Sequence, residues 1–331
     1  LAVLFSAFCL LASFGIGNMS QVNSIAANMT SAFSIPATVT GIVLVIIGAL
    51  VIVGGLKRIA AVTEKLVPFM AIAYVIGALV IFFANIGHVG AVFTAIFKGA
   101  FGLRAVGGGI VGSGVKLALT WGMKRGVFSN EAGLGSSVMV HSSSNVKEPV
   151  RQGLVSMTGP FLDTIIVCSM TGLALVMTGA YQIPGLEGAA VTTAAFQTGL
   201  PFIPGEAVSF VLMICLALFG FTTILGWDYY GERCLEYFSN GSKKAVKTYR
   251  WLYILAVFIG PYMTVSAVWT IADIFNACMA IPNMIALIVL SGVVVKETKD
   301  YFKRLDEAAG DEDNLAPRDT SDDWKAEEAT A

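Results

Sequence analysis

Residues 126–136 read Gly-Val-Phe-Ser-Asn-Glu-Ala-Gly-Leu-Gly-Ser, and they lie inside an apolar stretch that runs from about residue 108 to about residue 140. An ionisable side chain inside a membrane helix is costly and usually faces a cavity or a polar partner. Glycine weakens a helix, and non-helical backbone at membrane depth is tolerated only where it lines water or protein. The stretch therefore predicts a broken membrane helix at about 126–136 that contains Glu131.

The predicted break suits the binding of ions and substrates. Broken membrane helices expose backbone carbonyls to a cation and the N-terminus of a half-helix to a carboxylate. The alternative is a glycine-mediated crossing of two helices, in which a neighbouring helix satisfies Glu131. We favour the first interpretation because Ser129, Asn130 and Glu131 follow one another between glycines in an apolar stretch.

The composition is that of a membrane protein. Of 331 residues, 56% are hydrophobic and 13% are charged, whereas a soluble domain carries about 25% charged residues. Twelve of the 22 acidic residues follow residue 296. No basic stripe indicates nucleic-acid binding. The five cysteines are scattered, without metal-ligand or redox spacing, so we expect them to be packing residues.

Eight apolar stretches are long enough to cross a bilayer, which needs about 20 apolar residues in a helix. Backbone polar groups in lipid must be satisfied internally, so the expected fold class is all-α and integral to the membrane, with eight transmembrane helices. The chain begins at Leu1 inside the first stretch without a basic leader, and we expect an N-terminally truncated fragment. The stretches are 1–27, 36–55, 66–87, 108–140, 149–179, 205–231, 249–271 and 274–295.

Lysine and arginine concentrate in alternate connections between these stretches. Basic residues mark cytoplasmic loops, so both residue 1 and the C-terminus are expected in the cytoplasm. The basic connections are 57–65, 147–151, 233–250 and 296–299, whereas Lys98 and Arg104 are the exceptions in the others.

The chain divides into a membrane core at 1–296, with earlier helices missing, and a cytoplasmic acidic tail at 297–331. Residues 296–305 are expected to extend the last helix a little, since they are amphipathic. The remainder of the tail is acidic and poor in apolar residues, which predicts disorder.

Two further stretches carry polar residues at membrane depth. Asn18, Gln21 and Asn23 follow closely in the first stretch and cannot all face lipid. Asp163 and Thr164 lie near the middle of the fifth stretch. Each group alone is more often a contact between helices than a ligand-binding site.

The sixth stretch contains Thr222, Thr223 and Trp227. Thr223 and Trp227 are four residues apart and share one helix face, where the indole ring can cover a cation such as an ammonium group. Together with the break, these polar stretches indicate a shared cavity. Lys124 and Arg125, beside the break, either attract an anion or snorkel to the membrane surface, and we favour snorkelling.

Four motifs occur in order along the chain. They are Gly-Ile-Gly-Asn-Met-Ser-Gln at 15–21, Arg-Gly-Val-Phe-Ser-Asn-Glu-Ala-Gly-Leu-Gly-Ser at 125–136, Pro-Val-Arg-Gln-Gly at 149–153 and Gly-Trp-Asp-Tyr-Tyr-Gly-Glu-Arg at 226–233. These motifs resemble the signatures of the alanine or glycine:cation symporters, the sodium:alanine symporters. The resemblance covers residues 1 to about 300, and the motif at 125–136 is highly specific.

The resemblance implies an inverted-repeat fold like that of the neurotransmitter:sodium symporters. It implies that sodium, a co-transported ion and not a cofactor, drives the uptake of a small neutral amino acid, alanine or glycine. The expected location is a prokaryotic plasma membrane, the inner membrane in a Gram-negative cell. The expected partners are the amino acid, sodium and the lipid bilayer. Because the family's first broken helix is absent, we expect that this polypeptide alone does not transport.

The resemblance also assigns candidate site residues. It makes 129–133 the unwound part of the second repeat's first helix, and hydroxyls on the helix equivalent to 205–231 would hold sodium. The substrate-binding set is Gln21, Phe128, Ser129, Asn130, Gly133, Thr223 and Trp227; the sodium-binding set is Thr222 and Thr223; Glu131, Ala132 and Asp163 belong to the unwound helix and its coupling.

Two other classes of protein fit the sequence less well. A membrane enzyme would need a nucleophile with a base, or a metal cluster, at depth, but His88 and His141 lie at the ends of spans. A cation channel would need symmetric rings of carbonyls or carboxylates. Saturable sodium-dependent uptake would separate a transporter from a membrane enzyme and from a channel. Another cation-coupled transporter of the same fold is the nearest alternative.

Overall fold

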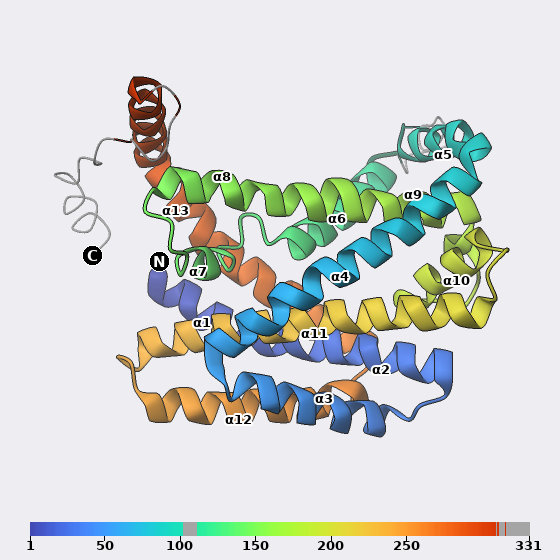
Figure 1. Cartoon of the computed structure of the whole chain (residues 1–331), viewed down its shortest axis with the longest axis horizontal. Helices are drawn as coiled ribbons and strands as arrows, with labels where there is room; N and C mark the ends of the chain where they lie inside the picture. The colour runs from blue at the N-terminus through green and yellow to red at the C-terminus, as the bar shows by residue number, and fades with distance from the viewer. Residues whose placement is uncertain (102–110, 309, 311–314, 316–331) are drawn as a thin grey trace.

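The computed structural model describes residues 1–101, 111–308, 310 and 315, and the regular elements in this part of the chain are all helices (Figure 1). The all-α prediction is therefore confirmed. Within the described residues, five helical segments are long and apolar enough to cross a membrane. They are α1–η1–α2 (Ala2–Ala12, Ser13–Met19, Ser20–Phe33), α4 (Gly55–Ala84), α8–η3–α9 (Pro149–Pro160, Phe161–Cys168, Ser169–Thr178), α11 (Gly205–Phe238) and α13 (Val265–Glu307).

The other three predicted spans are helices that are shorter or less apolar. Helix α3 (Ala37–Ile52) has 16 residues, α6 (Val111–Asn130) has 20, and α12 (Lys243–Ile259) has 17 with two lysines at its start. The smaller elements are η2 (Ile86–His88), α5 (Val89–Phe101), α7 (Val138–His141), η4 (Ala180–Gln182), α10 (Ala189–Gly199) and η5 (Gly260–Tyr262).

The predicted boundary between the seventh and eighth spans is wrong. The sequence places the break at about 272–273, beside Asp273, but the chain turns at η5 and α13 then runs unbroken through Asp273. Proline lacks a backbone N–H, so Pro261 favours a helix end. The hydroxyl of Thr264 then accepts a hydrogen bond from the backbone N–H of Ala267 at 3.3 Å and caps α13.

Most helices run along the long axis of the molecule (Figure 1). The N-terminus, the end of α13 and the connections α3–α4, α7–α8 and α11–α12 lie at one end. The connections α2–α3, α4–α5 and α10–α11 lie at the other. The connections predicted to be cytoplasmic from their basic residues are therefore gathered at one end of the bundle. Which side of the membrane that end faces stays a prediction.

Helix α11 is the centre of the bundle. It contributes to three clusters of buried apolar residues: one with α2, α3 and α12, one with α1, η1 and α13, and one with α4, α9 and α10. Representative members are Val22, Ile52, Leu225 and Tyr253 in the first, Ile16, Leu134, Trp227 and Met279 in the second, and Tyr74, Ile81, Phe196 and Leu212 in the third. Packing against helices on several sides therefore fixes the positions of the side chains of α11.

Large apolar side chains also face outward from the bundle. Ile288 and Val289 on α13 are 70% and 72% exposed, and Phe69 and Ile72 on α4 are exposed as well. Contiguous apolar surface of this kind is unfavourable in water but suits lipid. The outer surface therefore fits the apolar composition.

Candidate functional site

The backbone is irregular where the sequence predicts a break, over a narrower range than predicted, and α6 before it is not among the five long apolar helices. Helix α6 continues to Asn130, so Ser129 and Asn130 are helical, and the irregular segment spans 131–137 before α7. Three residues in it have positive φ: Glu131 at 55°, Gly133 at 81° and Gly135 at 87°. Glycine adopts this conformation freely, whereas for Glu131 it is uncommon and strained. The helical conformation of the backbone is therefore interrupted at Glu131, Gly133 and Gly135.

Side chains from three elements hold the break in place. The hydroxyl of Ser136 donates to the Glu131 carboxylate at 2.7 Å, and Tyr230 and Trp227 of α11 lie beside the same carboxylate. Asn283 of α13 donates to the Gly133 carbonyl at 2.9 Å. The hydrogen-bond donor to the Glu131 carboxylate thus lies within the irregular segment itself, and α13 binds the backbone of that segment.

Trp227 forms a wall behind the break. Its side chain is 2% exposed and belongs to the same buried cluster as Leu134. A side chain at Gly17 would overlap the indole, so this glycine of η1 permits the close approach of Trp227. Phe128 packs against this cluster, and its ring lies 4.9 Å from that of Trp269. The structure therefore brings Phe128, Trp227 and the break together.

A second polar contact joins the end of α6 to the π-helical segment η3. The hydroxyl of Ser129 donates to Asp163 at 2.6 Å, and the amide of Asn130 donates to the hydroxyl of Thr164 at 3.1 Å. The backbone N–H of Ala132 donates to the Asn130 side-chain oxygen at 2.8 Å. Single-turn π-helical distortions occur often at functional sites. No local pattern predicts the π-helical segment η3, whereas Asp163 and Thr164 are predicted as polar residues at membrane depth.

Gln21, Thr222 and Thr223 turn their polar atoms to the backbone of their own helical segments. Thr222 and Thr223 both donate to the Phe219 carbonyl, at 3.0 Å and 2.9 Å, and Gln21 donates to the Ile16 carbonyl at 3.3 Å. Among the hydrogen bonds of the described residues, none links these three side chains to 131–137. Both threonine oxygens keep acceptor capacity, so a cation ligand role is chemically open to them.

Arg125 and Lys124 bind a carboxylate of the protein itself, a partner that the sequence does not predict. One guanidinium nitrogen lies 3.0 Å and 2.9 Å from the two carboxylate oxygens of Asp273 on α13, and the group stacks over Trp269 at 4.3 Å. Lys124 lies 3.5 Å from the same carboxylate. An anionic partner attracts the pair, and it belongs to a helix far away in the chain.

Asparagines of the first span hold the turn between α12 and α13. Asn23 donates to the carbonyls of Gly260 and Met263 at 3.2 Å and 2.7 Å, and Asn18 donates to the Tyr253 carbonyl at 2.8 Å. Asn18 and Asn23 are both buried, as expected for polar residues that cannot face lipid. Asn23 has a structural role, because it supplies a donor to carbonyls at a helix end and in the turn that follows, whereas Asn18 joins the first span to the middle of α12.

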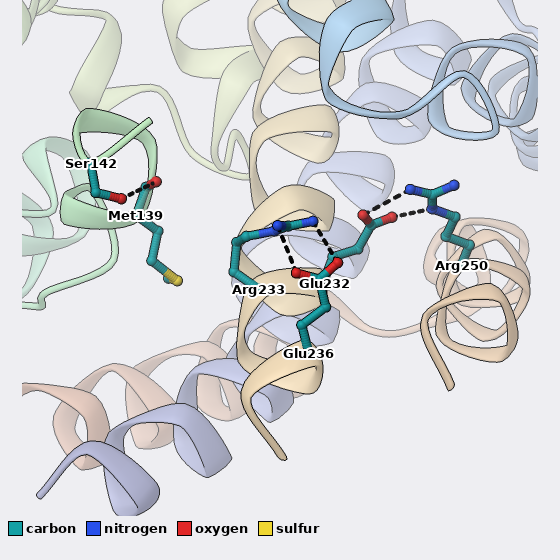
Figure 2. Close-up of polar contacts among 6 residues, drawn as sticks. All are labelled: Met139, Ser142, Glu232, Arg233, Glu236 and Arg250. Carbon is teal, nitrogen blue, oxygen red and sulfur yellow. Dashed lines mark hydrogen bonds and ion pairs between the residues drawn. The ribbon is translucent and has the colours of Figure 1, made fainter. Parts of the chain in front are cut away.

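Ion pairs gather at the end of the bundle that carries the basic connections. Figure 2 shows Glu232 of α11 bound by Arg250 of α12 through two guanidinium nitrogens, and Arg233 bound to Glu236. Arg304, near the end of α13, binds Glu148 at 2.9 Å and Asp300 at 2.8 Å. The pair of Glu232 and Arg250 joins α11 to α12, and the pair of Arg304 and Glu148 joins the end of α13 to the start of α8.

In the part of the chain that the structure describes, apolar helices long enough to span a membrane surround buried polar and aromatic residues, as in membrane transporters. The chain belongs to the sodium:alanine symporter family, whose family model matches residues 1–315. The resemblance inferred from the four motifs is therefore confirmed. Family and apolar helices together make it a multi-pass membrane protein of a symporter family and not an enzyme.

Three relatives show the breadth of this similarity. The chain is 49% identical over 306 residues to an uncharacterized transporter of Haemophilus influenzae, covering 92% of this chain and 66% of the relative. It is 45% identical over 304 residues to the sodium/alanine symporter AgcS of Methanococcus maripaludis, covering 91% and 65%. It is 36% identical over 312 residues to a sodium/proton-dependent alanine carrier protein of Bacillus sp., covering 89% and 68%. The chain thus spans less than two thirds of the first two relatives.

Proposed function

We propose that the intact protein couples the entry of sodium to the uptake of a small neutral amino acid, alanine or glycine, by alternating access. The observation that carries this proposal is the broken segment 131–137, held against the buried Trp227 in a chain of the sodium:alanine symporter family. A named sodium/alanine symporter, AgcS, is 45% identical to this chain. The proposal includes eight membrane helices in an inverted-repeat fold, in a prokaryotic plasma membrane, with a cytoplasmic C-terminus.

The aromatic residues account for the size of the proposed substrate. Trp227 and Phe128 fill the space beside the break, and Gly17 lets the indole pack tightly. Two bulky aromatic rings at the proposed site would leave room for a methyl group or a hydrogen as the substrate's side chain rather than for a long chain. The indole face also suits an ammonium group.

The polar residues around the break account for the rest of the proposed site. Ser129, Asn130 and Gly133 would orient the substrate from the end of α6, and Gln21 and Thr223 would approach from the first span and from α11. Glu131, Ala132 and Asp163 would couple the unwound segment to its neighbours. Thr222 and Thr223 would bind sodium by turning their hydroxyls from the Phe219 carbonyl, since each such bond contributes only about 1 kcal/mol net.

The test is uptake into proteoliposomes that contain the intact protein. An inward sodium gradient is expected to drive saturable accumulation of labelled alanine, and unlabelled glycine is expected to compete. Potassium in place of sodium should abolish accumulation. If labelled alanine does not accumulate but another labelled solute does so saturably under the same sodium gradient, another solute is the substrate of this fold. A sodium conductance that does not saturate would favour a channel.

A further inference from the structure

Asp228 is a buried carboxyl group that neither the proposed substrate site nor the ion pairs use. It follows Trp227 on α11, and its residue exposure is 0%. Among the described residues, neither of its side-chain oxygens has a hydrogen-bond partner. An ionised carboxylate without partners in an apolar interior is so unfavourable that such a group is normally neutral. The burial therefore points to a protonated carboxyl.

The two tyrosines of α12 that face Asp228 have their hydroxyl protons committed elsewhere. Tyr253 of α12 donates to the Ile224 carbonyl at 2.9 Å. Ser13 of η1 donates to the Leu10 carbonyl at 2.7 Å, so in the 2.9 Å contact between Ser13 and Tyr249 the tyrosine is the donor. Each hydroxyl has a single proton, and none is left to stabilise a charge on Asp228.

Two charged side chains of opposite sign lie beside Asp228. Glu232, one turn further along α11, repels a second negative charge, and the positive charge of Arg250 on α12 is bound to Glu232 through two nitrogens (Figure 2). Tyr249 and Tyr253 are the other titratable groups that face Asp228 from α12. The neighbouring elements η1, α2 and α3 carry no ionisable side chain.

We propose that Asp228 is a proton-binding site of this protein, which holds a proton in the conformation described here and releases it to water when α11 and α12 separate. Release leaves a carboxylate that either water or Arg250 can reach once the interface opens. Raising the pH therefore disfavours the closed interface and favours the open one. The expected effect of pH on amino-acid uptake rests on the proposed function, whereas the binding of a proton by Asp228 does not depend on it.

Infrared difference spectroscopy on the purified intact protein tests the site itself. The carbonyl stretch of a protonated carboxyl is expected in the wild-type protein and is expected to be lost in Asp228→Asn, which keeps the size and neutrality of the group. Glu206→Gln, an exposed carboxyl on the same helix, is the matched control and should leave this band unchanged. A wild-type band that survives in Asp228→Asn overturns the proposal.

Selective labelling of aspartate with carbon-13 gives the same test without a variant, should Asp228→Asn fail to fold. The protonated-carboxyl band of the wild-type protein is expected to shift, because Asp163 and Asp273 accept hydrogen bonds or ion pairs and Asp228 accepts none. A band that does not shift assigns the proton to a glutamate and overturns the proposal.

Uptake in proteoliposomes tests the consequence. Wild-type sodium-dependent alanine uptake is expected to change with pH over the range in which the infrared band disappears, and Asp228→Asn is expected to lose that dependence. An unchanged pH profile in Asp228→Asn contradicts the role in transport. If the wild-type protein shows no sodium-dependent uptake at any pH, the proposed function fails, and the infrared result still decides whether Asp228 binds a proton.

Discussion

Replacing Trp227 with leucine is the most informative perturbation of the proposed substrate site. The indole lies behind the break, 5.3 Å from the ring of Tyr230 and facing the carboxylate of Glu131. Leucine keeps an apolar side chain in the same buried cluster but removes the indole N–H and the aromatic face. The change therefore separates the chemistry of the indole from simple burial.

The size of the effect follows from what the indole offers to a substrate. Trp227 is buried, so a contact between its ring face and the ammonium group of an amino acid is shielded from water. Trp227→Leu removes this contact, at a cost of about 1–2 kcal/mol. If this cost is carried by the substrate-bound state, the apparent affinity for alanine weakens about 5- to 30-fold.

The assay is the concentration dependence of alanine and glycine uptake by the intact protein, corrected for the amount at the cell surface. Trp251→Leu is the matched control, because Trp251 lies on α12 with 57% of its surface exposed. The control is expected to keep the parental affinity. Parental affinity for both amino acids in Trp227→Leu, at normal surface levels, would show that the substrate site lies elsewhere.

Three further changes test other parts of the account. Thr223→Val keeps the shape of the side chain and removes the hydroxyl. If a buried partner is left unpaired, this costs about 1–3 kcal/mol, and the apparent affinity for alanine or sodium should weaken about 5- to 150-fold. Unchanged binding of both alanine and sodium would remove Thr223 from the site. Deletion of residues 306–331 from the intact protein should leave the uptake rate within about twofold, because this segment is acidic and poor in apolar residues, and complete loss of uptake would make it part of the mechanism. Arg304→Gln leaves Glu148 without its buried partner and should cost about 3 kcal/mol of stability, seen as a lower thermal midpoint, whereas Lys303→Gln at an exposed pair should change little.

Features that depend on short stretches of sequence are the ones that the sequence predicts well. The cost of polar groups in lipid is a local property, so the break near Glu131 and the burial of Asn18 and Asn23 follow from the residues themselves. The five long apolar helices follow from hydropathy and length. The gathering of the basic connections at one end of the bundle likewise agrees with their alternation along the chain.

Features that depend on contacts between distant residues escape the sequence. Arg125 is bound by Asp273, 148 positions away, and no local pattern distinguishes this from snorkelling. The boundary predicted at 272–273 fails for the same reason, because Asp273 has a partner on another helix and α13 continues through it. Helix α6 runs past Gly126 to Asn130, since glycine permits a break but does not impose one. The roles of Gln21 and Thr222 in binding stay predictions.

The most direct test of the account is reciprocal coupling in proteoliposomes that contain the intact protein. An inward gradient of alanine, imposed without a sodium gradient, is expected to drive the uptake of radioactive sodium, because two solutes that share one transport cycle drive each other. Trp227→Leu should shift this flux to higher alanine concentration. Sodium flux that is unaffected by the alanine gradient would contradict sodium-coupled symport.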